Sequence, residues 1–347
     1  MTTDSKLLRL TRDQILGHRR RVSALDVRLP AGSASLEKAA WAGLQDSMPR
    51  AALLSLHARV EDVAPDSWDD PALIQVWGPR WAVYVVAKRD VALFTVSRYP
   101  DDARGRAVAD KMAAGIRATI GRRRVKHDEA ASFVSGDSNR IKYATATGTL
   151  AIRWDGARQA DVWLMPRPRV APEVARRAVA RRHLHVYGPS SAAGFARWLG
   201  VDPAQARATY AKLLAAGEIV AASTPIGDAL ILAEDEASFR QPPDLPAAAR
   251  LLPSGDTFTL MTGADRDLLV PDAANRDRLW TPRVWPGALL VNGEIAGTWR
   301  RDQHKVTIES WRRLSPAEVR AVEAEALALP LPALAKPIAV TWLSSQA

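Results

Sequence analysis

The sequence predicts an α+β protein with three tandem winged helix-turn-helix units followed by a small C-terminal α+β domain. Three observations carry this prediction. Caps and turn residues in 188–232 mark two short helices and a hairpin, a similar order of elements occurs twice upstream, and a Pro-rich segment after Gln241 opens a mixed region. We therefore expect four domains, the first with a candidate active-site loop, at 1–99, 100–168, 169–240 and 241–347.

The segment 188–232 contains the clearest local signals. A cap at Ser190 or Ser191 begins one helix, which ends at Gly200, where a left-handed residue costs little. Asp202 begins a second helix with a capping box, and the β-rich runs EIVAAS and DALILA then form a hairpin. The second helix of such a unit usually enters the major groove of DNA, although the same unit also serves as a protein-interaction module.

The first unit begins with a helix at Thr11, which forms a capping box with Gln14. Two further helices are expected in LEKAAWAG and PRAALLSLHARV, and a short helix is expected to start at Asp70. The runs WAVYVV and ALFTVS are rich in β-formers, so we expect them to close this unit as two strands.

The second unit begins with a long helix over 101–121, followed by helical KHDEAASFV and a candidate recognition helix in DSNRIKYATAT. The runs TLAIRW and ADVWLM, joined by DGAR, predict its hairpin. An arginine-rich helix near Pro172 opens the third unit.

The C-terminal domain is predicted from strands and one capped helix. We expect a strand near Thr257 to Met261, a hairpin in ALLVNGEIAGTW with a type I′ turn at Asn292-Gly293, a helix capped at Ser315 and a last strand IAVTW.

Composition limits the function classes. The 347 residues are 47% hydrophobic and 25% charged, which is ordinary for a soluble globular protein, and the absence of cysteine excludes disulfides, thiolate catalysis and cysteine-based zinc sites. The N-terminus has no apolar leader and no segment is apolar enough to span a membrane, so we expect a cytoplasmic protein. The net charge of +10 favours an anionic partner, with nucleic acid the leading candidate.

The basic residues are clustered, which favours contact with a phosphate backbone, although each cluster could also be a solvated helix face. The candidate DNA-binding clusters are Arg122, Arg123, Arg124 and Lys126; Arg140 and Lys142; and Arg176, Arg177, Arg181 and Arg182.

Common catalytic motifs are absent. The chain has no P-loop, no GxGxxG after a strand, no GxSxG and no HExxH. His183 and His185 are close in sequence, but their i, i+2 spacing separates them on a helix, so we expect two polar helix residues and no metal site.

Four segments together resemble the winged-helix DNA glycosylases of the AlkZ/YcaQ-like family. They are GLQDSMPRAAL at 43–53, VWGPRWAVYVVAKRD at 76–90, RHLHVYGPSSAAGFARWLG at 182–200 and LLVNGEIAGTWRR at 289–301, and LLPSGDTFTL at 251–260 fits the same pattern. The resemblance implies three tandem winged helices around a DNA-binding cleft. It also implies a monomeric, cofactor-free enzyme that acts on double-stranded DNA and removes alkylated or bulky-adduct purines, in repair or in self-resistance to a genotoxin.

The resemblance places the catalytic motif at Gln45, Asp46 and Ser47. The family motif is a glutamine, an apolar residue and a second glutamine or an aspartate; here the first glutamine is kept, the middle residue is charged and the third is serine. Gln45 could hold a water with Ser47 as second partner, and Asp46 could stabilise positive charge if it points inward. Alternatively, Gln45 bonds loop backbone, Ser47 caps the following helix and Asp46 faces solvent or supports that helix.

A second departure lies in the run after Pro79. Many relatives have Arg-Gly-Thr-x-His there, whereas this chain keeps Arg80 and then has Trp81 and Tyr84, which could stack on a base or wedge into the duplex. Two functions from other classes stay open: a non-catalytic winged-helix regulator or damage-binding protein, and a protein-interaction scaffold.

Overall fold

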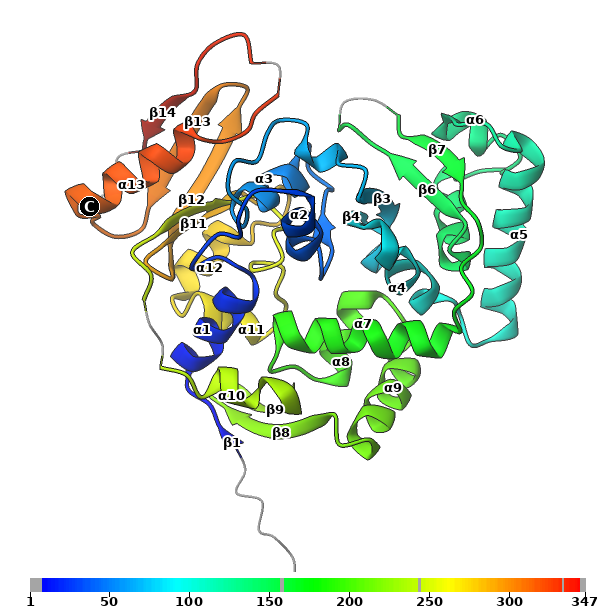
Figure 1. The fold of residues 1–347 in the computed structure, drawn as a ribbon, viewed down its shortest axis with the longest axis horizontal. Coiled ribbons are helices and arrows are strands. Elements are labelled where there is room, and N and C mark those ends of the chain that lie inside the picture. The colour runs from blue at the N-terminus through cyan, green and yellow to red at the C-terminus, as the bar shows by residue number, and fades with distance from the viewer. Residues whose placement is uncertain (1–7, 157–158, 243–244, 333, 344–347) are drawn as a thin grey trace, which may run out of the picture.

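The computed structural model describes residues 8–156, 159–242, 245–332 and 334–343. It is a mixed α+β structure, as predicted, with three sheets. In Figure 1 helices α2 (Ser33–Ala39) and α3 (Ala51–His57) lie near the centre, with the C-terminal sheet on one side and the hairpin of β6 (Leu150–Arg153) and β7 (Asp161–Leu164) on the other. Helices α7 (Pro172–Tyr187), α8 (Ala192–Leu199) and α9 (Pro203–Ala215) lie below. Within the described residues, no helix combines the length and apolar character needed to cross a membrane.

The third unit has the helices and hairpin that its caps predicted. They are α7 (Pro172–Tyr187), α8 (Ala192–Leu199), α9 (Pro203–Ala215), β8 (Ile219–Thr224) and β9 (Gly227–Leu232). Ser191 accepts from the Gly194 N–H, Gly200 is left-handed with φ 77°, and Asp202 forms the expected capping box. Strand β1 (Leu8–Arg9) pairs in parallel with β8, so the N-terminus joins this hairpin.

The first unit contains α1 (Arg12–Val22), α2 (Ser33–Ala39), β2 (Leu44–Gln45), α3 (Ala51–His57), β3 (Leu73–Trp77), β4 (Val83–Ala87) and α4 (Val91–Thr95). The capping box at Thr11 is confirmed. Two predictions are wrong. Asp70 caps a turn through the Ala72 N–H and leads into strand β3 instead of a helix. The run ALFTVS is helical, because Val91, Phe94 and Thr95 are buried at helical spacing.

The second unit contains α5 (Ala103–Ile120), β5 (Val125–Lys126), α6 (His127–Ala130), β6 (Leu150–Arg153) and β7 (Asp161–Leu164). The long helix and the hairpin are confirmed; two residues of the expected DGAR turn, 157–158, lie outside the described residues. The expected recognition helix is a 3₁₀ segment, Ser138–Thr147, packed on α5. Strand β6 pairs with β3, so both units share one sheet in the order β2-β4-β3-β6-β7-β5.

The C-terminal region contains α10 (Glu236–Phe239), β10 (Ala249–Leu252), α11 (Asp265–Leu269), α12 (Ala273–Leu279), β11 (Gly287–Val291), β12 (Glu294–Asp302), β13 (Lys305–Ser310), α13 (Pro316–Leu327) and β14 (Ala339–Trp342). Asn292 and Gly293 both have positive φ in the β11–β12 turn, and Ser315 caps α13 as predicted. The prediction of a strand near Thr257 to Met261 is wrong, because these residues form a buried loop.

A buried ion pair holds that loop against the first unit. The guanidinium of Arg59 donates to both oxygens of Asp256 at 2.7 Å, and Asp256 also accepts from the Ser55 hydroxyl and the Phe258 N–H. Both members are buried, and the loop also carries Gly255, which lies beside Gln45. The pair therefore fixes one wall next to the predicted catalytic glutamine.

We expect Asp256→Ala to lower the free energy of unfolding by roughly 3–5 kcal/mol, because it leaves the buried Arg59 cation without its carboxylate. Urea denaturation followed by far-UV circular dichroism measures this loss. Asp277→Ala, at an exposed position of α12, is the matched control and should change stability by less than about 0.5 kcal/mol. Equal effects of the two substitutions would contradict the role assigned to the ion pair.

Candidate functional site

Gln45 lies on strand β2, directly opposite Tyr84 of β4. Its Oε1 accepts from Arg80 Nη2 at 3.1 Å and from the Tyr84 hydroxyl at 3.5 Å. Because a guanidinium can only donate, the contact with Arg80 fixes which end of the amide faces it. The Nε2 end lies toward Gly255: a Cβ atom added to this glycine would lie 3.3 Å from Gln45 Nε2. Gln45 therefore has a fixed orientation, with both lone pairs of Oε1 engaged and its NH₂ group available to a ligand.

Arg80 is presented by a strained turn. Both Arg80 and Trp81 have left-handed backbone angles, with φ of 53° and 60°, which non-glycine residues rarely adopt. Gly200, at the end of α8, packs against the backbone of Arg80. The third unit thus supports the turn that orients Gln45.

Arg98 lies beneath the same turn and is 4% exposed. It donates to the carbonyl oxygens of Trp77 and Gly78, and its guanidinium carbon lies 3.6 Å from the centre of the Trp81 ring. Burial lowers the pKa of Arg98 to about 9, since no carboxylate among the described residues faces it. Sequence reasoning missed Arg98, because nothing in its local pattern distinguishes it from a surface arginine.

Asp46 points away from Gln45 into the protein and is 1% exposed. Its Oδ1 accepts from the Ala52 N–H at 2.9 Å, and its Oδ2 accepts from Gln75 Nε2 at 2.6 Å. The first contact satisfies a free N–H at the start of α3, the supporting role that the sequence left open. Burial raises the pKa of Asp46 to about 6.

Ser47 is exposed and lines a cavity of about 380 Å³. Three tryptophans, Trp77, Trp81 and Trp154, line the same cavity, together with Asn139 and other residues. The ring centres of Trp81 and Tyr143 lie 4.8 Å apart, edge to face. Trp81 was expected here as a stacking residue, whereas Trp154 was missed because it reaches the site only through the pairing of β6 with β3. Tyr84 is fully buried, so it supports Gln45 and offers no surface to DNA.

The predicted basic clusters differ in how far nearby acids neutralise them. Arg123 pairs with Glu129 at 2.6 Å, and Arg124 and Lys126 both pair with Asp161. Among the described residues, no ion pair engages the other exposed or half-exposed members, which are Arg122, Arg140, Lys142 and Arg177. Arg181 pairs with Glu218, Arg182 with Asp90 and the buried Arg176 with Asp101.

The two neighbouring histidines of α7 have different surroundings. His183 is 3% exposed and packs among Tyr187, Phe195 and Trp198, and burial lowers its pKa to about 3. His183 is thus an uncharged core residue. The prediction that both histidines are polar helix residues is therefore wrong for His183.

His185 lies with His18 and Asp235, and these three offer atoms within 4.8 Å of one another, close enough for a metal ion. The ring nitrogens of His18, however, already contact the Ser238 hydroxyl and the His185 carbonyl oxygen, at 2.8 and 2.9 Å. A hydrogen-bonded network accounts for these positions without a metal.

The raised pKa of Asp46 predicts a pH dependence of stability. The pKa of this carboxyl group is 3.8 in the unfolded chain and about 6 in the folded chain, so the folded chain binds the proton more tightly. Protonation of Asp46 therefore stabilises the fold at about pH 4 and below, and this stabilisation is lost as the pH rises through about 6. The Asp46→Asn variant has no titratable group at this position. Relative to this variant, the free energy of unfolding of the wild type should fall by up to about 3 kcal/mol between about pH 4 and neutral pH. Urea denaturation at a series of pH values measures this difference.

Asp62→Asn, at an exposed turn, keeps Asp46 and is the control; its stability should change with pH as that of the wild type does. A constant difference between wild type and Asp46→Asn across the window would show that the carboxyl group titrates near its ordinary value.

Comparisons with known proteins identify the family of this chain. The family model described as "DNA glycosylase AlkZ-like" matches residues 39–330. The solved structure of the Streptomyces sahachiroi DNA glycosylase AlkZ superposes with a TM-score of 0.77 and 16% sequence identity, covering 97% of this chain and 100% of that one. No curated protein sequence matches. The family model spans most of the chain, and the chain therefore belongs to the AlkZ-like DNA glycosylase family.

Proposed function

We propose that the protein is a monofunctional DNA glycosylase that hydrolyses the N-glycosidic bond of alkylated or bulky-adduct purines in double-stranded DNA. Such an activity serves DNA repair or self-resistance to a genotoxin. The observation that carries the proposal is the fixed carboxamide of Gln45, held by Arg80 beside a cavity-lining loop. Family membership supports DNA binding and DNA glycosylase chemistry, and the geometry of Gln45 supports the finer proposal.

The reaction needs a positioned water more than a strong base. In an N7-alkylated purine the ring is already cationic, so the C1′–N9 bond breaks with its electron pair going to the base, which leaves uncharged. Water then adds its oxygen to C1′ of the oxocarbenium-like sugar and releases a proton to solvent. An amide cannot take that proton, but it can hold the water in line with C1′. Gln45 has the free N–H donors that this needs, while Arg80 and Tyr84 hold its oxygen.

The tryptophan-lined cavity suits the bulky part of an adduct. Trp77, Trp81 and Trp154 offer large apolar faces, and Ser47 stands at its edge in the same loop as Gln45. A flat aromatic substituent on a purine would bury against these rings, with stacking worth about 1–3 kcal/mol per ring. We therefore assign the cavity to the lesion and not to the sugar that reacts.

A non-catalytic DNA-binding regulator or damage-binding protein is the second candidate, and one observation favours it. The Asp46 side chain is buried and faces away from Gln45, and both of its oxygens accept hydrogen bonds. Ser47 has a short side chain, so the motif places no second carboxamide or carboxylate beside Gln45. The same fold would then recognise damage without cleaving it.

Gln45→Ala distinguishes the two candidates. With DNA carrying N7-methylguanine or a bulky N7 adduct, we expect wild type to produce abasic sites and the variant to lose roughly 100-fold or more in single-turnover rate, because the water is no longer positioned. Alkaline cleavage of labelled duplexes measures the product.

Gln241→Ala, in an exposed loop outside the site, is the matched control and should retain full activity. If wild type and Gln45→Ala bind DNA alike and neither releases a base from any tested lesion, the result favours the regulator and overturns the proposal of an enzyme.

DNA affinity should depend on the unpaired cations of the second unit. We expect Arg122→Ala and Arg140→Ala each to weaken binding about equally for all sequences and to reduce the slope of log affinity against log salt by about 0.9, as for one lost phosphate contact. Fluorescence anisotropy over a range of salt concentrations measures both quantities. Arg320→Ala, exposed on α13, is the control, and an equal loss in this variant would contradict a localised binding surface.

A further inference from the structure

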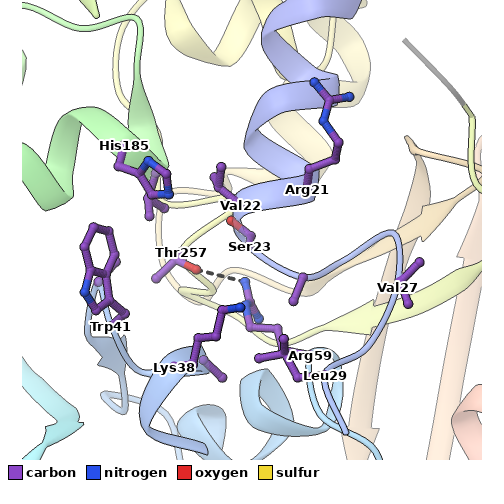
Figure 2. A pocket seen from close by; sticks show the side chains of 14 residues that line it. Arg21, Val22, Ser23, Val27, Leu29, Lys38, Trp41, Arg59, His185 and Thr257 are labelled. Atoms are coloured by element: carbon purple, nitrogen blue, oxygen red, sulfur yellow. Dashed lines mark hydrogen bonds between the residues drawn. The ribbon is translucent and has the colours of Figure 1, made fainter. Parts of the chain in front are cut away.

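A cavity of about 390 Å³ lies apart from Gln45 and from the tryptophan-lined cavity. It is enclosed by the end of α1 and the following loop, the end of α2 and the end of α7, as Figure 2 shows. Its volume falls within the range of about 300–1,000 Å³ that is typical of small-molecule sites. Neither Gln45 nor Ser47 lines it.

One wall carries an oriented histidine. Asp235 is buried, and its two oxygens lie 2.8 and 2.9 Å from His185 Nδ1. A carboxylate accepts, so Nδ1 carries a proton, and in the neutral imidazole Nε2 then keeps its lone pair. His185 lines the cavity and is partly exposed, so an acceptor atom of fixed orientation is available there.

A second residue that lines the cavity, Ser23, carries a hydroxyl group that needs a partner. Ser23 is 8% exposed, and within the part of the chain that the structure describes its Oγ has no hydrogen-bond partner. A buried polar group without a partner costs about 1–3 kcal/mol, so such a group suggests a ligand or an ordered water. Figure 2 draws Ser23 and His185 around the same space.

The cavity is cationic on one side and apolar elsewhere. None of the described residues that line it is acidic, and Lys38 is exposed, with no ion pair to any described residue. The charge of Arg59 is neutralised by Asp256, so Lys38 supplies the positive potential. Trp41 forms an aromatic wall.

Trp41 is held in place from two sides. The guanidinium of Arg182 lies 4.8 Å from the Trp41 ring, and the His185 ring packs edge-on at 5.1 Å. Arg182 is itself fixed by Asp90, to which it donates two hydrogen bonds of 2.8 Å. A flat ligand therefore meets a preformed ring face.

We propose that this cavity is a second ligand site, which binds a flat ring carrying one anionic group, the chemistry of a nucleoside monophosphate. Lys38 meets the phosphate, Trp41 contacts the base, His185 Nε2 accepts from an N–H or O–H of the ligand, and the Ser23 hydroxyl completes the polar contacts. The ligand is either a free nucleotide or the terminal nucleotide of a DNA strand. This proposal does not rest on glycosylase activity, because none of these residues contacts Gln45.

Isothermal titration calorimetry with the full chain tests the proposal. Deoxyguanosine 5′-monophosphate should bind at least 10-fold more tightly than deoxyguanosine or inorganic phosphate. Lys38→Glu should weaken this binding at least 10-fold and Ser23→Ala several-fold, while Lys305→Glu, exposed on β13, should have no effect. Gln45→Ala should bind the nucleotide like wild type, which separates this site from the proposed catalytic one.

Three results would overturn the proposal: no nucleotide binding, equal binding by wild type and Lys38→Glu, or binding of inorganic phosphate as tight as that of the nucleotide. Circular dichroism checks that each variant is folded. Competition by a 5′-phosphorylated oligonucleotide, lost in Lys38→Glu, would identify the DNA strand as the source of the ligand, and binding without such competition would identify the free nucleotide.

Discussion

The geometry of the candidate site depends on one buried carboxylate, that of Asp46. It joins the loop after β2 to the start of α3 through Ala52, and to strand β3 through Gln75. Gln75 in turn accepts from the Trp154 N–H at 2.6 Å, at the end of β6. Asp46, together with Gln75, therefore connects the candidate catalytic loop, the helix that follows it and the hairpin of the second unit. Because its neighbours in sequence are Gln45 and Ser47, the position of both is set by a residue that faces away from them.

The opposite side of the site is set by strain and by a buried cation. The left-handed turn at Arg80 and Trp81 costs conformational energy, and contacts from Gly200 and Arg98 hold it in place. Among the described residues, the partners of Arg98 are carbonyl oxygens and an aromatic face, which stabilise a buried positive charge less than a carboxylate would. Such an arrangement is expected where a backbone is held for function instead of stability.

The sequence predicted the third unit well, because its helices begin and end at residues with strong local preferences, such as Ser191, Gly200 and Asp202. It predicted the first unit less well. ALFTVS has β-forming residues but packs as a helix, since tertiary burial of Phe94 outweighs local preference. The loop containing Asp256 has an apolar pattern that suggests a strand, yet its conformation follows from a contact with Arg59, almost two hundred residues away. Trp154 and Asp235 were missed for the same reason: each joins its site through pairing or packing distant in sequence.

The charged residue in the middle of the motif follows from the hydrogen-bonding needs of its partners. The Trp154 N–H fixes the carbonyl end of Gln75, so the NH₂ end must face position 46. The Ala52 N–H also faces that position. Two donors converge there, and an apolar side chain of the kind expected from the family motif would leave both without an acceptor, at about 1–3 kcal/mol each. An asparagine would satisfy one and oppose the other with its own NH₂ group. Asp46 and Gln75 therefore form a matched pair, and the departure at Asp46 is explained by the support it gives the loop and not by a direct part in bond cleavage.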